Sequence, residues 1–304
     1  MRELSIKNRF LEVKLPIRII VIVAIVVIFT TVTSACQRAP RVLDGLCFSP
    51  FLNENPMRYR VVSSGRVREL VDKIAPYTSG LRTYASAGEW AEVVKSAQRH
   101  GLYVAAGAGI CNIRERNEIE VEGLIKNIQS GGVDLAVLGD EILYFSQVSE
   151  DELISYIERV KATGVPTTTA EVWDVLLAHP RVMQAVDVVI MNVWPEATGI
   201  SEGDALEFID SAYHKVKAKA GGKEVIVETG WPSAGLTNGE AVFSQANAGS
   251  FLKEFTSWAR VNNVKYFYFE AFDETYKEKV EGTTGPHWGL WDKDGIMKPF
   301  ARPV

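Results

Sequence analysis

Short apolar runs alternate with amphipathic stretches from about residue 41 to the end of the chain. The runs have the length and β-branched content of buried strands, and the stretches between them place apolar residues three and four positions apart, as helices do. The predicted strands are Leu46–Phe51, Gly80–Ala85, Tyr103–Gly107, Asp134–Leu138, Pro166–Ala170, Val186–Trp194, Glu224–Val227 and Val264–Phe269. The predicted helices are Val67–Ile74, Ala87–His100, Asn117–Gln129, Ser149–Lys161, Ser201–Ala218 and Glu240–Val261, with a short helix around Asp174–Arg181.

Eight such strands within about 260 residues have the size and rhythm of a (β/α)8 barrel. A doubly wound sheet is the competing α/β fold, and it would call for a glycine-rich phosphate turn. Gly107 and Gly109 form a G-x-G at the end of the third predicted strand, but no third glycine opens a helix after them. We therefore predict one (β/α)8 TIM barrel domain over residues 41–304, a monomer that uses no cofactor.

Residues 1–36 have the composition of an export leader. Five basic residues against two acidic ones in the first 18 positions precede the uncharged apolar run Ile19–Phe29, and small residues follow up to Cys36. Small residues before a cysteine resemble the lipobox of bacterial lipoproteins, although Thr33 stands where leucine is usual. Lipidation at Cys36 is the favoured alternative, beside simple cleavage and an uncleaved membrane anchor. We expect export to the cell envelope or secretion.

Charge and ligand composition exclude several classes of function. The leader is basic, so the remainder of the chain has a net charge near −8, against −5 for the whole, and it has no basic runs. Nucleic acid is therefore not an expected partner. The four histidines are scattered, and no Cys/His cluster has metal-ligand spacing, so no metal site is predicted. Cys47 and Cys111 lie in apolar surroundings and are expected to be buried free thiols.

Two predicted strands end in carboxylates. The apolar run before Glu228 is followed at once by Gly230 and Trp231, and a second run ends in Gly139, Asp140 and Glu141. A charged group at the end of an apolar strand is costly to bury, and it is typical either of a salt bridge or of a reactive site. In a barrel of this type both would face one active site. Two carboxyl groups are the minimum equipment for hydrolysing a glycosidic bond.

Aromatic and polar side chains stand at the other strand ends. Aromatic rings stack on the C–H faces of sugars, and polar side chains bind hydroxyl groups, so the set is typical of a site for an uncharged polysaccharide. For Trp173, Trp194, Trp231 and Trp288, sugar stacking and packing within the barrel are both open. The predicted substrate contacts are Arg82, Tyr84, Asp140, Trp173, Asn192, Trp194, Trp231 and Glu270.

Several of these segments resemble glycoside hydrolase family 17, the β-1,3-glucanases and related transglycosylases. The most specific matches are Glu228-Thr229-Gly230-Trp231-Pro232-Ser233 and the later segments Phe267–Glu274 and Pro286–Asp292, which are similar to the fungal and bacterial branch. Arg82-Thr83-Tyr84 and Asn192-Val193-Trp194-Pro195 resemble its second-strand and sixth-strand motifs. The first-strand segment Cys47–Phe51 has Phe where the family often has Tyr. The resemblance covers residues 43 to 299.

The resemblance implies a (β/α)8 barrel with retaining chemistry, in which Glu228 is the nucleophile and Glu141 the acid/base. Ionised Glu228 is then expected to keep Glu141 protonated. The family usually has Asn immediately before the acid/base, where its amide helps to bind the sugar 2-hydroxyl, and this chain has Asp140 instead. An Asp accepts that hydroxyl's proton but cannot donate one, and it adds negative charge beside Glu141.

Three functions follow from these expectations. The first is hydrolysis of β-1,3-linked glucan by two glutamates in a double displacement. The second is a β-1,3-glucanosyltransferase with the same residues, in which a sugar attacks the intermediate in place of water. The third is a catalytically weak glycan-binding protein of the cell envelope, which only Asp140 favours. The sequence does not separate the first two, because acceptor preference depends on the shape of the pocket.

Overall fold

The computed structural model describes residues 43–54 and 62–302. The predicted leader, with Cys36, lies outside these residues. Within them, no helix has the length and apolar content needed to cross a bilayer. The described residues belong to one compact unit.

Eight parallel strands close into a barrel in the order in which they follow one another along the chain, β1 to β8. This confirms the predicted (β/α)8 fold. The strands are β1 (Leu46–Cys47), β2 (Gly80–Arg82), β3 (Tyr103–Ala108), β4 (Leu135–Asp140), β5 (Thr167–Val172), β6 (Val189–Asn192), β7 (Val225–Thr229) and β8 (Tyr266–Tyr268). Each predicted strand overlaps one of them. The predicted strands at Leu46–Phe51 and Val186–Trp194 are too long, because both run into loops at the barrel ends.

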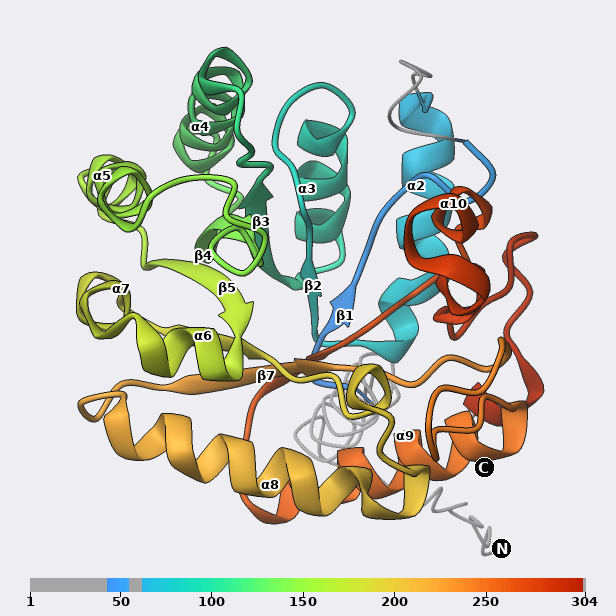
Figure 1. The fold of residues 1–304 in the computed structure, drawn as a ribbon. Coiled ribbons are helices and arrows are strands. Elements are labelled where there is room, and N and C mark those ends of the chain that lie inside the picture. The colour runs from blue at the N-terminus through green and yellow to red at the C-terminus, as the bar shows by residue number, and fades with distance from the viewer. Residues whose placement is uncertain (1–42, 55–61, 303–304) are drawn as a thin grey trace, which may run out of the picture. The chain divides into compact units, whose positions relative to one another are not determined.

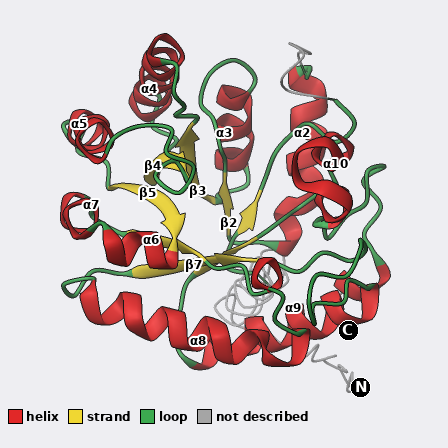
Figure 2. Ribbon diagram, in the orientation of Figure 1, coloured by secondary structure: helices red, strands yellow, loops and turns green. Residues whose placement is uncertain are grey.

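Helices surround the strands on all sides (Figures 1 and 2). They are α2 (Ser64–Ile74), α3 (Trp90–Arg99), α4 (Arg114–Gln129), α5 (Glu150–Lys161), α6 (Trp173–Ala178), α7 (Pro180–Ala185), α8 (Glu202–Lys219), α9 (Gln245–Val261) and α10 (Glu278–Glu281). Serine side chains cap the first turns of α2, α5, α8 and α9. At α9 the cap is Ser244, so this helix begins five residues later than predicted. Pro180 splits the stretch predicted as one short helix into α6 and α7, because proline restricts the residue before it.

The core has two layers. One set of apolar residues fills the space between strands and helices, and a smaller set fills the barrel interior, including Cys47, Val137, Ile190, Ile226 and Phe267. Cys47 and Cys111 are free thiols, as predicted; Cys47 is buried, but Cys111 is partly exposed.

Strand β4 carries an irregularity next to the predicted acidic pair. Its register against β5 shifts between Val137 and Asp140, and Gly139 has a φ of +77°. A Cβ at Gly139 would lie 2.7 Å from the Ile142 side chain, so both the backbone conformation and the packing favour glycine. Glu141, two residues after Gly139, has a φ of +55°, which is rare for a residue with a side chain. Gly139 therefore serves a bulge that turns the end of β4.

Candidate active site

The carboxyl ends of β2, β4, β6 and β7 bring the predicted catalytic residues into one hydrogen-bonded network. Arg82 is the last residue of β2, Asp140 the last of β4, and Asn192 the last of β6. Glu228 lies one residue before the end of β7, and Glu141 directly follows β4. Because all strands of a (β/α)8 barrel run in the same direction, their final side chains meet at the same face, where active sites of this fold lie.

Glu228 is fully buried and is surrounded by hydrogen-bond donors. The Arg82 guanidinium lies 3.0 Å from Oε2 through Nε and 3.3 Å from Oε1 through Nη1. The Tyr84 hydroxyl donates to Oε1 at 3.0 Å. Burial raises the pKa of Glu228 to about 7, with Arg82 and the Tyr84 hydrogen bond acting in the opposite direction and the charge of Asp140 adding to the rise. The donors orient this carboxylate and favour its ionised form.

Glu141 is held by donors through one oxygen only. Its Oε1 accepts hydrogen bonds from Asn192 Nδ2 at 3.0 Å and Trp194 Nε1 at 2.6 Å, and its Oε2 has no hydrogen bond to the described residues. Burial raises the pKa of Glu141, and among charged neighbours Asp140 contributes most to the rise. From the sequence, we had expected the charge of Glu228 to be the main cause of a raised Glu141 pKa. A raised pKa keeps the group protonated, and Oε2 is free to present the proton.

Asp140 links the two glutamates. Its Oδ1 accepts from Arg82 Nη2 at 2.7 Å and from Asn192 Nδ2 at 3.1 Å. Arg82 thus bridges Asp140 and Glu228, while Asn192 bridges Asp140 and Glu141. The Asp140 side chain keeps 34% of its surface exposed. An aspartate at this position is therefore accommodated by an ion pair with Arg82, and one side of it still faces the solvent.

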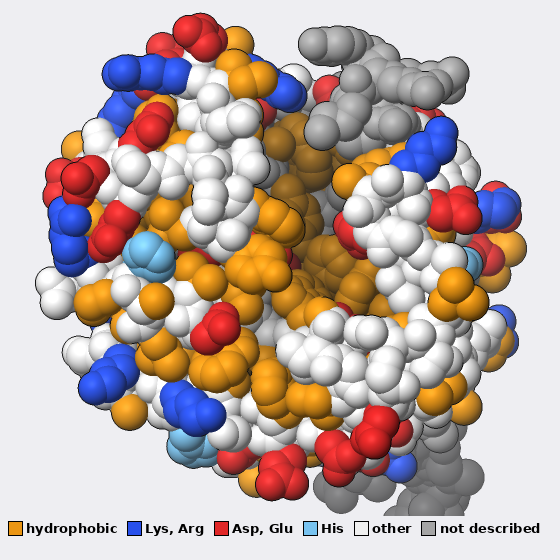
Figure 3. All heavy atoms as spheres, viewed as in Figure 1, with side chains coloured by type: hydrophobic (Ala, Val, Ile, Leu, Met, Phe, Trp, Pro, Cys, Tyr) orange, Lys and Arg blue, Asp and Glu red, His pale blue; other side chains and the backbone are white. Residues whose placement is uncertain are grey.

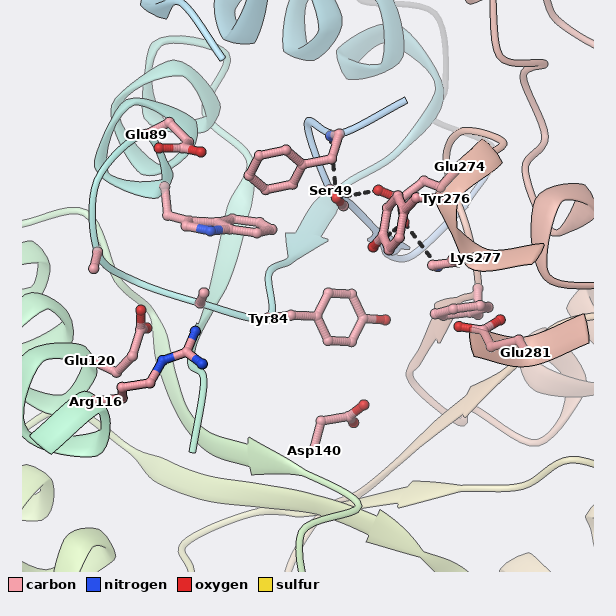
Figure 4. Close-up of a pocket in the computed structure, with 15 residues that line it drawn as sticks. Ser49, Tyr84, Glu89, Arg116, Glu120, Asp140, Glu274, Tyr276, Lys277 and Glu281 are labelled. Carbon is pink, nitrogen blue, oxygen red and sulfur yellow. Dashed lines mark hydrogen bonds and ion pairs between the residues drawn. The ribbon is translucent and has the colours of Figure 1, made fainter. Parts of the chain in front are cut away.

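Two cavities meet at this network and share Asp140, Phe269 and Glu281 in their walls. One, here called the Tyr84 arm, measures about 430 Å³; Figure 4 shows Tyr84 in it between Asp140 and the group of Ser49 and Tyr276. The other, here called the Glu141 arm, measures about 580 Å³ and has both Glu141 and Glu228 in its wall. Its further walls include Phe145, Trp194, Glu196, Leu236, Phe243 and Trp288. Figure 3 shows the hollow with apolar side chains around it.

Three predicted substrate contacts do not line this cleft, and the structure corrects them. Trp231 is 1% exposed and packs between the barrel and α9, against Phe251. Trp173 starts α6 and packs on Phe208 of α8. The carboxylate of Glu270 is buried by Lys277, whose Nζ lies 2.6 and 2.7 Å from its two oxygens. Each follows a strand, but its backbone turns the side chain toward the helices or into an ion pair.

The remaining predicted contacts divide into two groups. Tyr84, Asp140 and Trp194 line the cleft, so each can touch a ligand directly. Arg82 and Asn192 are fully buried and contact the three carboxyl groups of the network. They act by holding those groups in place.

Sequence reasoning missed a buried cluster around Lys277. Besides Glu270, its ammonium group contacts Glu274 at 2.9 Å, and Ser49 donates to the same glutamate. The ammonium also lies 4.3 Å from the centre of the Phe269 ring, which borders both arms. Part of this cluster could have been predicted from the sequence, because Lys277 follows Glu274 by three residues. The contact between Glu274 and Ser49 could not, because closure of the barrel brings these distant segments together.

No group of His, Cys, Asp or Glu within residues 43–54 and 62–302 has the arrangement of a metal site. Asp140 and Glu228 are instead paired with Arg82, Glu274 is paired with Lys277, and Glu141 accepts from neutral donors. The described residues thus provide two hydrogen-bonded carboxyl groups with different partners, at the junction of a cleft lined by aromatic rings.

Comparisons with known proteins show to which family the chain belongs. Residues 45–289 match the model of the BtgE/BtgC glycoside hydrolase domain. A glucan 1,3-beta-glucosidase of Candida albicans is 26% identical over 208 residues, which cover 60% of this chain and 68% of that protein. A glucan 1,3-beta-glucosidase of Schizosaccharomyces pombe is 28% identical over 247 residues, covering 74% and 77%.

A similar solved structure is the glycoside hydrolase family 17 β-1,3-glucanosyltransferase of Rhizomucor miehei. It superposes with a TM-score of 0.75 at 25% identity, over 85% of this chain and 96% of that one. An active-site mutant of the same enzyme was solved in complex with laminaritriose. Because the family model spans most of the barrel, the chain belongs to the family of the BtgE/BtgC glycoside hydrolase domain, within glycoside hydrolase family 17, as its strand-end motifs predicted.

Proposed function

We propose that this protein is a retaining glycoside hydrolase that cleaves β-1,3-linked glucan, with Glu228 as nucleophile and Glu141 as acid/base. The observation that carries the proposal is the single network in which Arg82, Asp140 and Asn192 join the two glutamates at the junction of the cleft. The relatives named above act on β-1,3-glucan, which supports this substrate.

The contacts suit a double displacement. Glu228 attacks the anomeric carbon while Glu141 gives its proton to the departing glycosidic oxygen, so that the sugar becomes bound to Glu228 as an ester. Glu141, now a carboxylate, takes a proton from an incoming water, whose oxygen attacks the same carbon and releases Glu228. Asn192 and Trp194 hold Oε1 of Glu141 in both steps, and Arg82 with Tyr84 orients the nucleophile.

Product analysis tests this proposal directly. The barrel domain is incubated with laminarin oligosaccharides, and the products are separated by length. Shorter sugars alone indicate a hydrolase, and longer ones indicate the alternative glucanosyltransferase, which the likeness to the Rhizomucor miehei enzyme favours. A preparation that binds laminarin but leaves its length distribution unchanged would contradict both and leave a glycan-binding protein.

We further propose that the chain is exported and acts at the cell envelope, attached by a lipid on Cys36. The basic and apolar composition of residues 1–36 supports this. We expect Cys36→Ala to move the full-length protein from the membrane fraction to the soluble fraction. An unchanged membrane fraction in this variant would point to an uncleaved anchor.

Asp140→Asn tests the departure from the family pattern. The charge of Asp140 raises the pKa of both Glu228 and Glu141, so its removal lowers both. The acidic limb of the pH–rate profile depends on ionised Glu228, and the alkaline limb depends on protonated Glu141. We therefore expect the whole profile for β-1,3-glucan to move to lower pH, with activity at the optimum unchanged or increased.

The measurement is kcat/KM against pH for both proteins on one laminarin oligosaccharide. An unchanged profile would show that the Asp140 charge does not act on the pair. A loss of activity at every pH, without a shift, would show that Asp140 is adapted to a different sugar.

A further inference from the structure

The turn directly after Glu141 carries two exposed aromatic rings. Tyr144 is 56% exposed and Phe145 is 59% exposed, and their rings meet edge to face with centres 4.9 Å apart. Among the described residues, Tyr103 is the one other aromatic residue with a large exposed surface, and it lies at the opposite end of the barrel, where β3 begins. Exposed rings beside a cleft are typical of a binding surface.

Hydrogen bonds to a buried glutamate fix the backbone of this turn. Glu171, fully buried on β5, accepts hydrogen bonds from the backbone N–H of Leu143 at 2.7 Å and of Tyr144 at 3.4 Å. Phe145 N–H donates to the carbonyl oxygen of Glu141 at 3.0 Å, and Ile142 is buried beneath the turn. The two rings are therefore presented on a fixed backbone, which lowers the entropy lost when a ligand packs against them.

Phe145 forms part of the wall of the Glu141 arm, together with a second exposed apolar side chain from a different loop. Leu236 is 74% exposed, and its N–H is fixed by a hydrogen bond to Thr283 Oγ1 at 2.9 Å. Trp194 and Trp288 lie deeper, with ring centres 5.6 Å apart. The wall of the Tyr84 arm contains more charged groups, among them Glu89, Glu120 and Arg116.

We propose that Phe145, supported by Tyr144, and Leu236 form a binding site for the glucose unit on the leaving-group side of the scissile bond. The inference rests on the proposed function. Glu141 must reach the departing oxygen, so the sugar attached to that oxygen lies next to Glu141 and to the turn directly after it, which carries Phe145. A β-linked glucose unit carries its ring hydrogens on both faces, and these flat apolar faces match exposed aromatic and aliphatic side chains.

The same site receives a sugar that replaces water in the second step. The acceptor's hydroxyl gives its proton to the Glu141 carboxylate, its oxygen bonds to the anomeric carbon, and the bond from that carbon to Glu228 breaks. Water needs no apolar surface to make this attack, whereas a sugar does. Phe145 and Leu236 therefore determine which substrate length is preferred and how well a sugar competes with water for the glycosyl-enzyme.

The test compares two substrates of different reach. Laminaripentaose extends into both arms, whereas β-laminaribiosyl fluoride has a leaving group too small to contact Phe145. For Phe145→Ala we expect kcat/KM on laminaripentaose to fall by about tenfold, which corresponds to ~1.4 kcal/mol. The kcat on the fluoride should stay within about twofold of the original, because its second step needs Glu141 but not the apolar site.

Matched variants sharpen the comparison. Ile296→Ala removes an equally exposed apolar side chain (60% exposed) that does not line the cleft, and it should leave both substrates unaffected. Phe145→Tyr keeps a ring and should behave like the original protein. Laminaribiose is then added as an acceptor to reactions with the fluoride substrate, and the ratio of transfer product to hydrolysis product is measured. To reach the same ratio, Phe145→Ala should need about tenfold more laminaribiose than the original protein.

Equal kcat/KM on laminaripentaose in Phe145→Ala and Ile296→Ala would overturn the inference while leaving the proposed function intact. A fall in fluoride kcat as large as that on laminaripentaose would also overturn it, because Phe145 would then be positioning Glu141. If the original protein released no fluoride and cut no oligosaccharide, the proposed function itself would fail.

Discussion

Glu228→Gln is expected to lower turnover of β-1,3-glucan by about 10⁴-fold or more while leaving the barrel folded. The side-chain amide cannot attack the anomeric carbon as a carboxylate does, so no ester forms. Its oxygen can still accept from Arg82 and from Tyr84, which contact Glu228 at 3.3 and 3.0 Å. Arg82 also keeps its ion pair with Asp140 at 2.7 Å, so the buried guanidinium is not left without an anion.

The measurements are initial rates on laminarin together with circular dichroism and thermal unfolding. Glu224→Gln makes the same chemical change just before β7, at the other end of the barrel, where Glu224 pairs with Lys265. It should keep activity within about twofold, as substitutions at exposed ion pairs usually do. Near-normal turnover by a folded Glu228→Gln protein would remove Glu228 from the role of nucleophile.

The second large effect is expected from Glu141→Ala, and it depends on the substrate. Natural glucan needs a proton on its departing oxygen, so its cleavage should fall by about 10²–10⁴-fold. An aryl laminaribioside with an acidic phenol departs without that proton, so formation of the glycosyl-enzyme should be far less impaired. The intermediate then accumulates, because no base remains to activate water.

Azide provides the matching control for Glu141→Ala. As an anion it needs no base, so it should attack the glycosyl-enzyme, restore turnover and give a β-glycosyl azide with retained configuration. The original protein should give little azide product, because its Glu141 carboxylate repels the anion. Equal losses on glucan and aryl substrate, with no azide product, would argue against Glu141 as the acid/base.

Much of the fold was predictable because the signals are local. Apolar runs such as Val225–Val227 are too short and too β-branched to be anything but strands, and the closed barrel then places their ends together. The strand-end positions of Glu228, Glu141 and Arg82 were predictable in this way. The bulge at Gly139 could not be predicted, since it depends on how β4 pairs with β5 and on the packing of Ile142.

The directions of the tryptophan side chains also could not be predicted from the sequence. Trp194 and Trp231 each follow a strand by two residues, yet Trp194 bonds Glu141 in the cleft while Trp231 packs against α9. The outcome depends on the backbone path of each loop, which long-range contacts determine. No sequence pattern pointed to Phe145 as a binding residue either, because its exposure at the edge of the cleft depends on the closed barrel.

The bridge that Arg82 makes between Asp140 and Glu228 has a consequence for the second half of the reaction. When Glu228 becomes an ester it loses its negative charge, and the guanidinium would then be an unbalanced cation near Glu141, which would weaken that base. The Asp140 carboxylate, 2.7 Å from Arg82, balances that cation after Glu228 has lost its charge. The aspartate therefore shields the base from the cation while the sugar is covalently held, and it keeps Glu141 strong enough to activate whichever hydroxyl, of water or of sugar, arrives next.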